Sequence, residues 1–400
     1  MAGARILLLI FIVLVLMGFW EAFLHKRNLS RMPIRIHVNG TRGKSSVVRL
    51  IAGGLRESGI RTCAKTTGTL ARMILPDASE YPVFRPGGAN VIEQVRIVST
   101  AASYDAQALV VECMALQPQL QWMCESRFIK ATHGVITNAR ADHLDVMGPE
   151  EKDVALALAA TTPVKAKLFT AEGKFLDVFE NAARDRQARL IQVTSEEVAA
   201  VTDQELEGFQ YVEHRENVAL ALRVCADLGI DRQTALKGMW KAPPDPGVMT
   251  ISHIRFFGRH IYFVNVFAAN DPESTEKLWN MALEKFPDTE KRIIIFNCRS
   301  DRPHRSAQLG VACSQWQPAD SYILMGSGTQ FLERAAISKG VPPKKFVSAE
   351  HQSDGDIFEV VIEQAGRSAV VVGMGNAKGQ GLSLARFFRN RSILKEERIN

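Results

Sequence analysis

Residues 33–46 read Pro-Ile-Arg-Ile-His-Val-Asn-Gly-Thr-Arg-Gly-Lys-Ser-Ser, the most informative segment in the first half of the chain. The residues from Pro33 to Asn39 predict a short β-strand, and the residues from Lys44 to Ser58 predict a helix with one apolar face. In a phosphate-binding loop, glycines let backbone N–H groups approach the phosphates, a lysine supplies charge, and the next hydroxyl binds Mg²⁺. The stretch therefore predicts a phosphate site between a strand and a helix.

The match to the general phosphate-loop motif is incomplete, because Val38 stands where the motif places its first glycine. The alternative is a glycine-containing turn with an incidental lysine. The strand before the loop and the helix after it stand where the motif requires them, which favours the phosphate site. We therefore expect ATP to be bound by Gly40, Thr41, Arg42, Gly43, Lys44, Ser45 and Ser46.

Apolar strands alternate with helix-like segments along the rest of the chain, which is typical of a parallel sheet covered by helices. Prolines in the segment 241–247 cannot continue a helix, so a domain boundary is expected there. Strands are predicted at 108–112, 133–138, 167–170, 261–266, 292–296, 321–325 and 368–372. The expected fold is α/β, with a mainly parallel central P-loop domain over residues 33–245 and a smaller C-terminal α/β domain over residues 246–400.

The first 32 residues differ from everything that follows. The run from Ile6 to Trp20 is unbroken and apolar, and it approaches the roughly 20 residues that cross a bilayer. A signal peptide is the competing interpretation, but no small-residue cleavage site follows the run. Basic residues gather after it, so the positive-inside rule predicts a single-pass anchor in the cell membrane, with the soluble domains in the cytoplasm.

Composition narrows the class of protein further. The formal net charge is +6, but basic and acidic residues are interspersed, so no nucleic-acid partner is expected. The six cysteines form no CxxC pair and have no histidine at a metal-ligand spacing. They are expected to be reduced, packed thiols of a cytosolic compartment.

The loop variant Gly-Thr-x-Gly-Lys-Ser-Ser resembles that of the Mur ligase and folylpolyglutamate synthetase superfamily. Glu112 matches the family's Mg²⁺-binding glutamate, and residues 138–145 resemble a segment whose asparagine lies near the adenine and whose histidine serves a second metal. Taken alone, Glu112 would be an ordinary strand-end carboxylate and His143 a packed or surface histidine. The resemblance implies that Lys44, Glu112 and His143 are catalytic, that Ser45, Glu112 and His143 bind metal, and that Asn138 binds ATP.

Three further segments carry the resemblance. Residues 214–217 look like the family's His-Asn-x-x-Asn helix, which implies that Asn217 contacts ATP. Residues 270–274 resemble its His-Asn-Pro-x-Ser loop. Residues 297–302 resemble a segment that brings positive charge towards the phosphates, which implies ATP contacts for Arg299 and Asp301, although a solvated basic turn is the alternative. The family's carbamylated lysine has no counterpart in residues 154–160, so none is assigned.

The apolar segment occupies the place of the separate substrate domain of many Mur ligases. This arrangement, together with blocks at 65–69, 145–149, 242–247 and 267–271, resembles the poly-γ-glutamate synthetase family (CapB/PgsB). The resemblance implies an ADP-forming amide ligase that uses ATP and Mg²⁺ to polymerise glutamate through γ-linked amides, by way of an acyl phosphate. It also implies that the partners are glutamate, the poly-γ-glutamate chain and small integral membrane subunits of a synthase and export complex. A homo-oligomer is left open.

Arginine binds carboxylates bidentately, so Arg72, Arg85 and Arg96 are candidates for binding the substrate. Asn270 and Asp271, in the loop that resembles the family's His-Asn-Pro-x-Ser loop, are further candidates. Each arginine could equally be a surface charge. Two other functions stay open: a folylpolyglutamate-like or other anchored amino-acid ligase, and a membrane-bound P-loop NTPase for switching or transport. The Asp142–His143 pair and the 270–272 loop favour ligation over simple hydrolysis.

Overall fold

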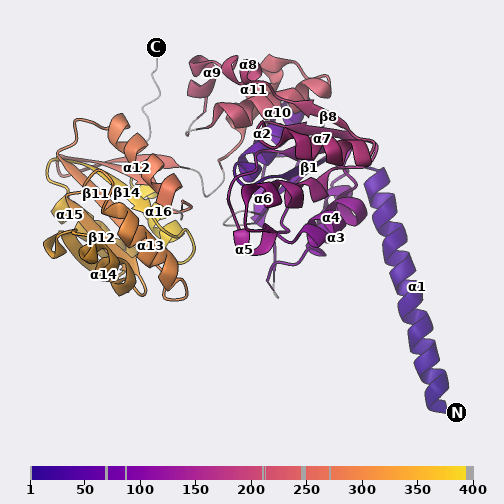
Figure 1. Cartoon of the computed structure of the whole chain (residues 1–400), viewed down its shortest axis with the longest axis horizontal. Helices are drawn as coiled ribbons and strands as arrows, with labels where there is room; N and C mark the ends of the chain where they lie inside the picture. Colours follow the sequence, from indigo (N-terminus) through magenta and orange to yellow (C-terminus); the bar gives the residue numbers. More distant parts are fainter. Residues whose placement is uncertain are drawn as a thin grey trace. The chain divides into compact units, whose positions relative to one another are not determined.

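The computed structural model describes residues 2–67, 71–85, 88–209, 211, 213–244, 249–269 and 272–392. The chain divides into two compact units, Met1–Asp245 (unit 1) and Pro246–Asn400 (unit 2). Each unit holds one mainly parallel sheet with helices packed on it (Figure 1). The predicted α/β class is therefore confirmed.

Unit 1 is built on an eight-stranded sheet in the order β4-β3-β2-β5-β1-β6-β7-β8. The strands from β2 to β8 in this order are parallel, whereas β3 and β4 pair antiparallel at one edge. The strands are β1 (Ile34–Asn39), β2 (Thr62–Thr66), β3 (Arg72–Ile74), β4 (Glu80–Pro82), β5 (Ala108–Glu112), β6 (His133–Ile136), β7 (Lys167–Thr170) and β8 (Arg189–Gln192).

Helices cover both faces of this sheet because successive strand side chains point to opposite faces. Val110 of β5 packs in the core that α2, α10 and α11 share, while its neighbours Leu109 and Val111 pack with α3 on the other face. The helices of unit 1 are α1 (Ala2–Ser30), α2 (Lys44–Glu57), α3 (Glu93–Ser103), α4 (Pro118–Met123), the π-helix η1 (Cys124–Ile129), α5 (Leu144–Met147), α6 (Glu151–Leu158), the 3₁₀ turn η2 (Ala159–Thr161), α7 (Leu176–Asp185), α8 (Ser195–Ala199), α9 (Asp203–Glu207), α10 (Arg215–Asp227) and α11 (Arg232–Lys241).

Helix α1 contacts the rest of unit 1 through its last turns. Its side chains from Ile6 to Phe19 are exposed, whereas Leu29 is buried. A ring nitrogen of His25 lies 3.0 Å from the Phe128 carbonyl oxygen of η1. Among the described residues, Arg5–Ser30 is the helix that is long and apolar enough to cross a membrane.

Unit 2 has a six-stranded sheet in the order β13-β12-β11-β14-β10-β9, parallel except for the β9–β10 pair. Strands β11 and β14 are adjacent and parallel, so their carboxyl ends lie at the same edge of the sheet. The elements are β9 (Thr250–Phe256), β10 (Arg259–Asn265), α12 (Pro272–Lys285), β11 (Lys291–Cys298), α13 (Pro303–Cys313), β12 (Ser321–Gly326), α14 (Gln330–Ser338), η3 (Pro343–Lys345), β13 (Phe346–Glu350), α15 (Asp354–Gln364), β14 (Ser368–Met374) and α16 (Gln380–Asn390).

The antiparallel strands at the sheet edges were not predicted. Strand β4 spans three residues and includes Pro82, and proline argues against a strand in sequence patterns. Strand β9 is paired on one side and half exposed, so it lacks the continuous apolar run of the central strands.

All six cysteines are free and buried, which confirms the prediction that they are reduced, packed thiols.

In unit 1, a buried charged pair joins β1 to η1. His37 Nδ1 lies 2.8 Å from Glu125 Oε2, and both side chains are almost fully buried. Burial alone would lower the pKa of His37, but hydrogen bonds with Cys113 and Glu125 raise it to about 9. The histidine is therefore protonated at neutral pH.

We predict that this pair makes unit 1 less stable at alkaline pH. A folded pKa of about 9 lies above the unfolded value of 6.5, so the stabilisation is complete below pH 6.5 and is lost as the pH rises through 9. The free energy of unfolding should fall by roughly 2–3 kcal/mol between pH 7 and pH 10. The control is the neutral double variant His37→Gln/Glu125→Gln, which should lack this component. Equal pH dependence in the two proteins would contradict the assignment.

Candidate active site

The predicted phosphate loop follows β1, which lies between β5 and β6 in the sheet. All three strands are parallel, so their carboxyl ends meet at one edge. This edge collects Gly40–Gly43 after β1, Glu112 at the end of β5, and Thr137 and Asn138 after β6. Ligands of open parallel sheets bind at such an edge.

Two glycines of the loop stand where no side chain fits. Gly40 has a φ of 134°, and a Cβ atom there would lie 2.0 Å from Thr137 Oγ1. Gly43 has a φ of 79°, and its Cβ atom would lie 2.6 Å from Asn217 Oδ1. The loop backbone is therefore packed closely against the ends of β6 and α10, in conformations that favour glycine.

The loop carries positive charge at the start of α2. Lys44 Nζ donates hydrogen bonds to the carbonyl oxygens of Gly40 at 2.6 Å and Thr41 at 3.2 Å, so the ammonium lies over the loop. Ser45 and Ser46 lie in the first turn of α2 and are partly exposed. Backbone N–H groups of a first helical turn have no partner within the helix, and together with the lysine they favour an anion.

A carboxylate lies directly beside the loop. Glu112 is 2% exposed, and its Oε2 accepts hydrogen bonds from Ser45 Oγ and from the Thr67 backbone N–H, both at 2.7 Å. A serine hydroxyl and a carboxylate are the oxygen ligands that Mg²⁺ takes when phosphate and water complete its shell. The described residues contain no group of three or more His, Cys, Asp or Glu that could hold a metal by themselves. Ser45 and Glu112 could supply part of the shell of a cation whose other ligands are phosphate and water.

Asn138 braces the loop itself. Its Oδ1 accepts a hydrogen bond from the Thr41 hydroxyl at 2.6 Å and from the Arg42 backbone N–H at 3.1 Å, and its Nδ2 donates to the Arg42 carbonyl at 3.2 Å. Thr137 Oγ1 donates to the same carbonyl at 2.6 Å. The amide predicted to lie near adenine therefore has contacts that position the phosphate loop.

Asn217 lies on the other side of the loop, next to Gly43. Its Nδ2 donates to Glu213 Oε1 at 2.8 Å, and burial raises the pKa of this glutamate. His143, the predicted second metal ligand, is at the start of α5, and its exposed side chain lies 3.8 Å from Asp142 Oδ1. The structure places Asn217 beside the loop but gives His143 no hydrogen bond to Ser45 or Glu112 among the described contacts.

The three predicted substrate arginines occupy different surroundings. Arg85 makes two hydrogen bonds of 2.7 Å to the buried Glu93, which also pairs with Lys65 at 2.7 Å. Burial alone would raise the pKa of Glu93, but Arg85 and Lys65 lower it. The buried Nε of Arg72 has no partner within the described part of the chain. Arg96 is exposed and lines a groove along α1, away from the loop residues.

The predicted segment of unit 2 lies at the carboxyl end of β11, next to the end of β14. Asn297 Nδ2 donates to the carbonyl oxygens of Asn376 at 2.6 Å and Lys378 at 3.0 Å, which ties the two loops together. Arg299 and Asp301 form a bidentate pair with each other, at 2.9 and 2.6 Å. Asn270 and Asp271 lie outside the described residues.

Sequence patterns did not identify several residues that shape the loop. Thr137 fixes the Arg42 carbonyl, and Thr67 holds Glu112. Lys65 and Glu93 form a buried ion pair that the sequence separates by 28 positions. Thr67 and Lys65 lie in the block 65–69 that carries the family resemblance, and this was the available signal.

Comparisons with known proteins match the chain along almost its whole length. The Mur ligase middle domain model matches residues 38–221, and the poly-gamma-glutamate synthase CapB C-terminal domain model matches residues 251–391. The chain is 36% identical over 388 residues to capsule biosynthesis protein CapB of Bacillus anthracis, covering 96% of this chain and 83% of that protein. It is 37% identical over 369 residues to PGA synthase CapB of Bacillus subtilis, covering 92% and 93%.

Solved structures share the fold. FolC of E. coli in complex with DHPP and ADP matches with a TM-score of 0.66 and 15% identity, covering 93% of each chain. Folylpolyglutamate synthase of Mycobacterium tuberculosis complexed with ADP matches with a TM-score of 0.65 and 16% identity, covering 93% of this chain and 94% of that one. At these identities the likeness shows the fold alone.

The contacts of Asn138 lead to a prediction about nucleotide binding. Asn138→Ala removes three hydrogen bonds from the loop, each worth about 1 kcal/mol net, and should weaken ATP binding by at least about tenfold. Because these contacts are to the phosphate loop, GTP binding should weaken by the same factor. Calorimetric titration with both nucleotides measures this, with exposed Asn181→Ala as the control. A selective loss of ATP binding would instead assign Asn138 to the adenine.

Proposed function

Because the chain belongs to the CapB family of poly-γ-glutamate synthases within the Mur ligases, we propose that it is an ATP-dependent ligase that joins glutamate residues through γ-linked amide bonds and releases ADP. The family predicted from the sequence is confirmed. The observation that best supports this activity is the hydrogen bond from Ser45 to Glu112, next to Lys44. These residues lie at the edge of the sheet where the phosphate loop follows β1. The folylpolyglutamate-like alternative is supported by fold likeness alone.

The reaction proceeds in two steps. A glutamate γ-carboxylate oxygen attacks the γ-phosphorus of ATP, and the bond from that phosphorus to the bridging oxygen breaks. ADP departs, and the glutamate becomes an acyl phosphate. The amine of the next glutamate then attacks the acyl carbon, the amide forms, the amine loses a proton and inorganic phosphate leaves. Both reactants of the first step are anions, so their approach requires positive charge.

The chain's own residues meet this requirement in distinct ways. Lys44 places its ammonium over the loop, and the N–H groups at the start of α2 can donate hydrogen bonds to phosphate oxygens. Asn138 holds the loop through hydrogen bonds, and Asn217 lies close to Gly43 on the other side. Mg²⁺ held by Ser45 and Glu112 would neutralise phosphate charge when bound. The proposal also includes His143 as a further metal ligand. It includes ATP contacts of Arg299 and Asp301, for which Arg299 would have to release Asp301 and bind phosphate.

We place the protein at the cell membrane as a single-pass protein, with both units in the cytoplasm. Support comes from α1, which is exposed, apolar and followed by basic residues. One helix encloses no path for a polyanion through a bilayer, and within the described residues it is the one candidate span. Small integral membrane subunits are therefore expected as partners, with glutamate and the polymer as ligands.

The proposed chemistry predicts how the loop variants behave. Phosphate release from ATP should depend on added glutamate and produce ADP. Lys44→Ala removes the loop charge and Glu112→Ala removes the buried carboxylate, so each should lower amide formation by roughly 10²- to 10³-fold or more. Coupled phosphate assays and mass analysis of products measure this in membranes that carry the full chain.

The matched control is Lys152→Ala, an exposed lysine on α6, which should retain activity. Phosphate release that is indifferent to glutamate would favour a switching or transport NTPase. Formation of AMP and pyrophosphate, or a fully active Lys44→Ala protein, would refute the ligase proposal.

A further inference from the structure

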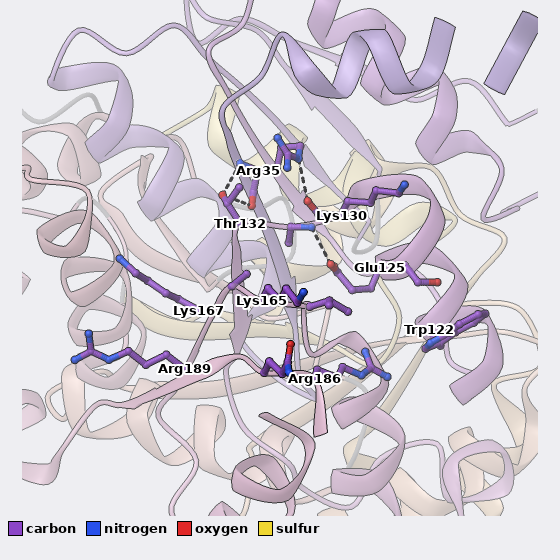
Figure 2. Close-up of a pocket in the computed structure, with 14 residues that line it drawn as sticks. Arg35, Trp122, Glu125, Lys130, Thr132, Lys165, Lys167, Arg186 and Arg189 are labelled. Atoms are coloured by element: carbon purple, nitrogen blue, oxygen red, sulfur yellow. Dashed lines mark hydrogen bonds between the residues drawn. The ribbon is translucent and has the colours of Figure 1, made fainter. Parts of the chain in front are cut away.

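A cavity of about 800 Å³ opens at the edge of the central sheet opposite the phosphate loop (Figure 2). Its walls are the starts of β1, β7 and β8, the segment before β6, and the π-helix η1. Because β1 spans six residues, this edge lies about 20 Å from the loop. Six cationic residues line the cavity: Arg35, Lys130, Lys165, Lys167, Arg186 and Arg189.

Little negative charge offsets these cations. Among the lining residues, all of which are described, Glu125 is the one carboxylate. It is already engaged, because Oε2 pairs with protonated His37 at 2.8 Å and Oε1 accepts the Ala131 N–H at 2.8 Å. Lys167 pairs with Asp227 at 2.7 Å.

The remaining five cations form no ion pair with a carboxylate within the described part of the chain. Arg35 and Arg186 donate to backbone carbonyl oxygens, which orient the guanidinium groups without neutralising them. The side chains of Lys130, Lys165 and Arg189 are exposed and make no hydrogen bond or ion pair within the described part of the chain. Figure 2 shows Lys167 and Arg189 on one side of the hollow and Lys130 on the other.

Tight turns shape the rim of the cavity. Lys130, Lys165 and Gln187 all line it and have φ values of 48°, 52° and 54°, in the left-handed region that side chains rarely adopt. Lys130 caps the end of η1 and Gln187 follows the end of α7, positions where helices commonly finish in this conformation, so these turns fix the rim of the cavity. Ser126 of the π-helix also lines the cavity, and its buried hydroxyl has no partner among the described residues.

Apolar groups stand between the charges. Trp122 is 43% exposed and Val164 is 62% exposed, and both line the cavity. In a γ-linked glutamyl chain, each residue contributes one α-carboxylate and two backbone methylene groups. The cavity offers the complement of both features, since cations suit the carboxylates and the exposed apolar side chains suit the methylenes. The cations are spread over the starts of three strands, which suits an extended polyanion better than a single phosphate group.

We propose that this basic cavity, lined by Lys130, Lys165 and Arg189, binds a stretch of poly-γ-glutamate already made. This inference rests on the proposed ligase function and adds a second polymer site to it. Because the cavity lies about 20 Å from the loop, it holds an earlier part of the chain while the growing end reacts. Binding there keeps the product on the enzyme between additions, so each polymer chain receives more glutamate residues before it is released.

The test uses the full chain in phosphatidylcholine nanodiscs, titrated with a synthetic γ-linked glutamate octamer. The double variant Lys165→Gln/Arg189→Gln should bind the octamer about tenfold more weakly, and this difference should shrink at high salt. Its ATP affinity and its rate of ADP release with a γ-glutamyl dipeptide acceptor should be unchanged, while its products become shorter. The control Lys237→Gln/Lys339→Gln removes the same charge from exposed positions elsewhere and should match the wild type.

Equal octamer affinity in the two double variants would overturn the proposal. So would unchanged octamer binding with lost binding of dihexanoyl phosphatidylglycerol, since the cavity would then be a lipid site. Equal loss of inorganic polyphosphate binding and octamer binding would overturn the γ-glutamyl assignment. A selective loss of octamer binding, in a chain that forms no polymer, would support the cavity and refute the ligase function separately.

Discussion

The parallel pairing of β1 with β5 and β6 is the constraint on which the site depends. The register places Val38 beside Glu112 and Asn39 beside Ile136, so the phosphate loop emerges between a carboxylate and the Thr137–Asn138 segment. The 2.7 Å bond from Ser45 to Glu112 follows from this register. A shift of one residue would turn each side chain to the other face of the sheet and separate the loop from its partners.

The same sheet separates two kinds of positive charge. At the carboxyl edge, Lys44 and the start of α2 form a compact anion site next to a buried carboxylate. At the opposite edge, cations from several strand starts surround a wide hollow whose one acid is neutralised by His37. A small, closely hydrogen-bonded site suits phosphate, whereas a wide basic hollow suits an extended polyanion. A ligase that makes a polyanion can use both.

Local patterns predicted the parts of the structure that local physics determines. The strand, loop and helix of residues 33–58 were predicted because periodicity and glycine chemistry act over a few residues. The ion pair of Lys65 with Glu93 and the brace from Asn138 to Arg42 were not predicted, since they join segments that lie far apart in the sequence. The basic cavity was hidden for the same reason, because its cations are scattered along the sequence.

The central claim is that the loop transfers the γ-phosphoryl group of ATP to a glutamate carboxylate. The most direct measurement uses glutamate labelled with ¹⁸O in its γ-carboxylate and follows the released phosphate by mass spectrometry. If an acyl phosphate forms, the attacking oxygen leaves with phosphorus when the amine displaces it. We therefore expect one ¹⁸O atom in the phosphate for each amide bond formed. Phosphate that contains only oxygen from water or ATP, while amide accumulates, would contradict the account.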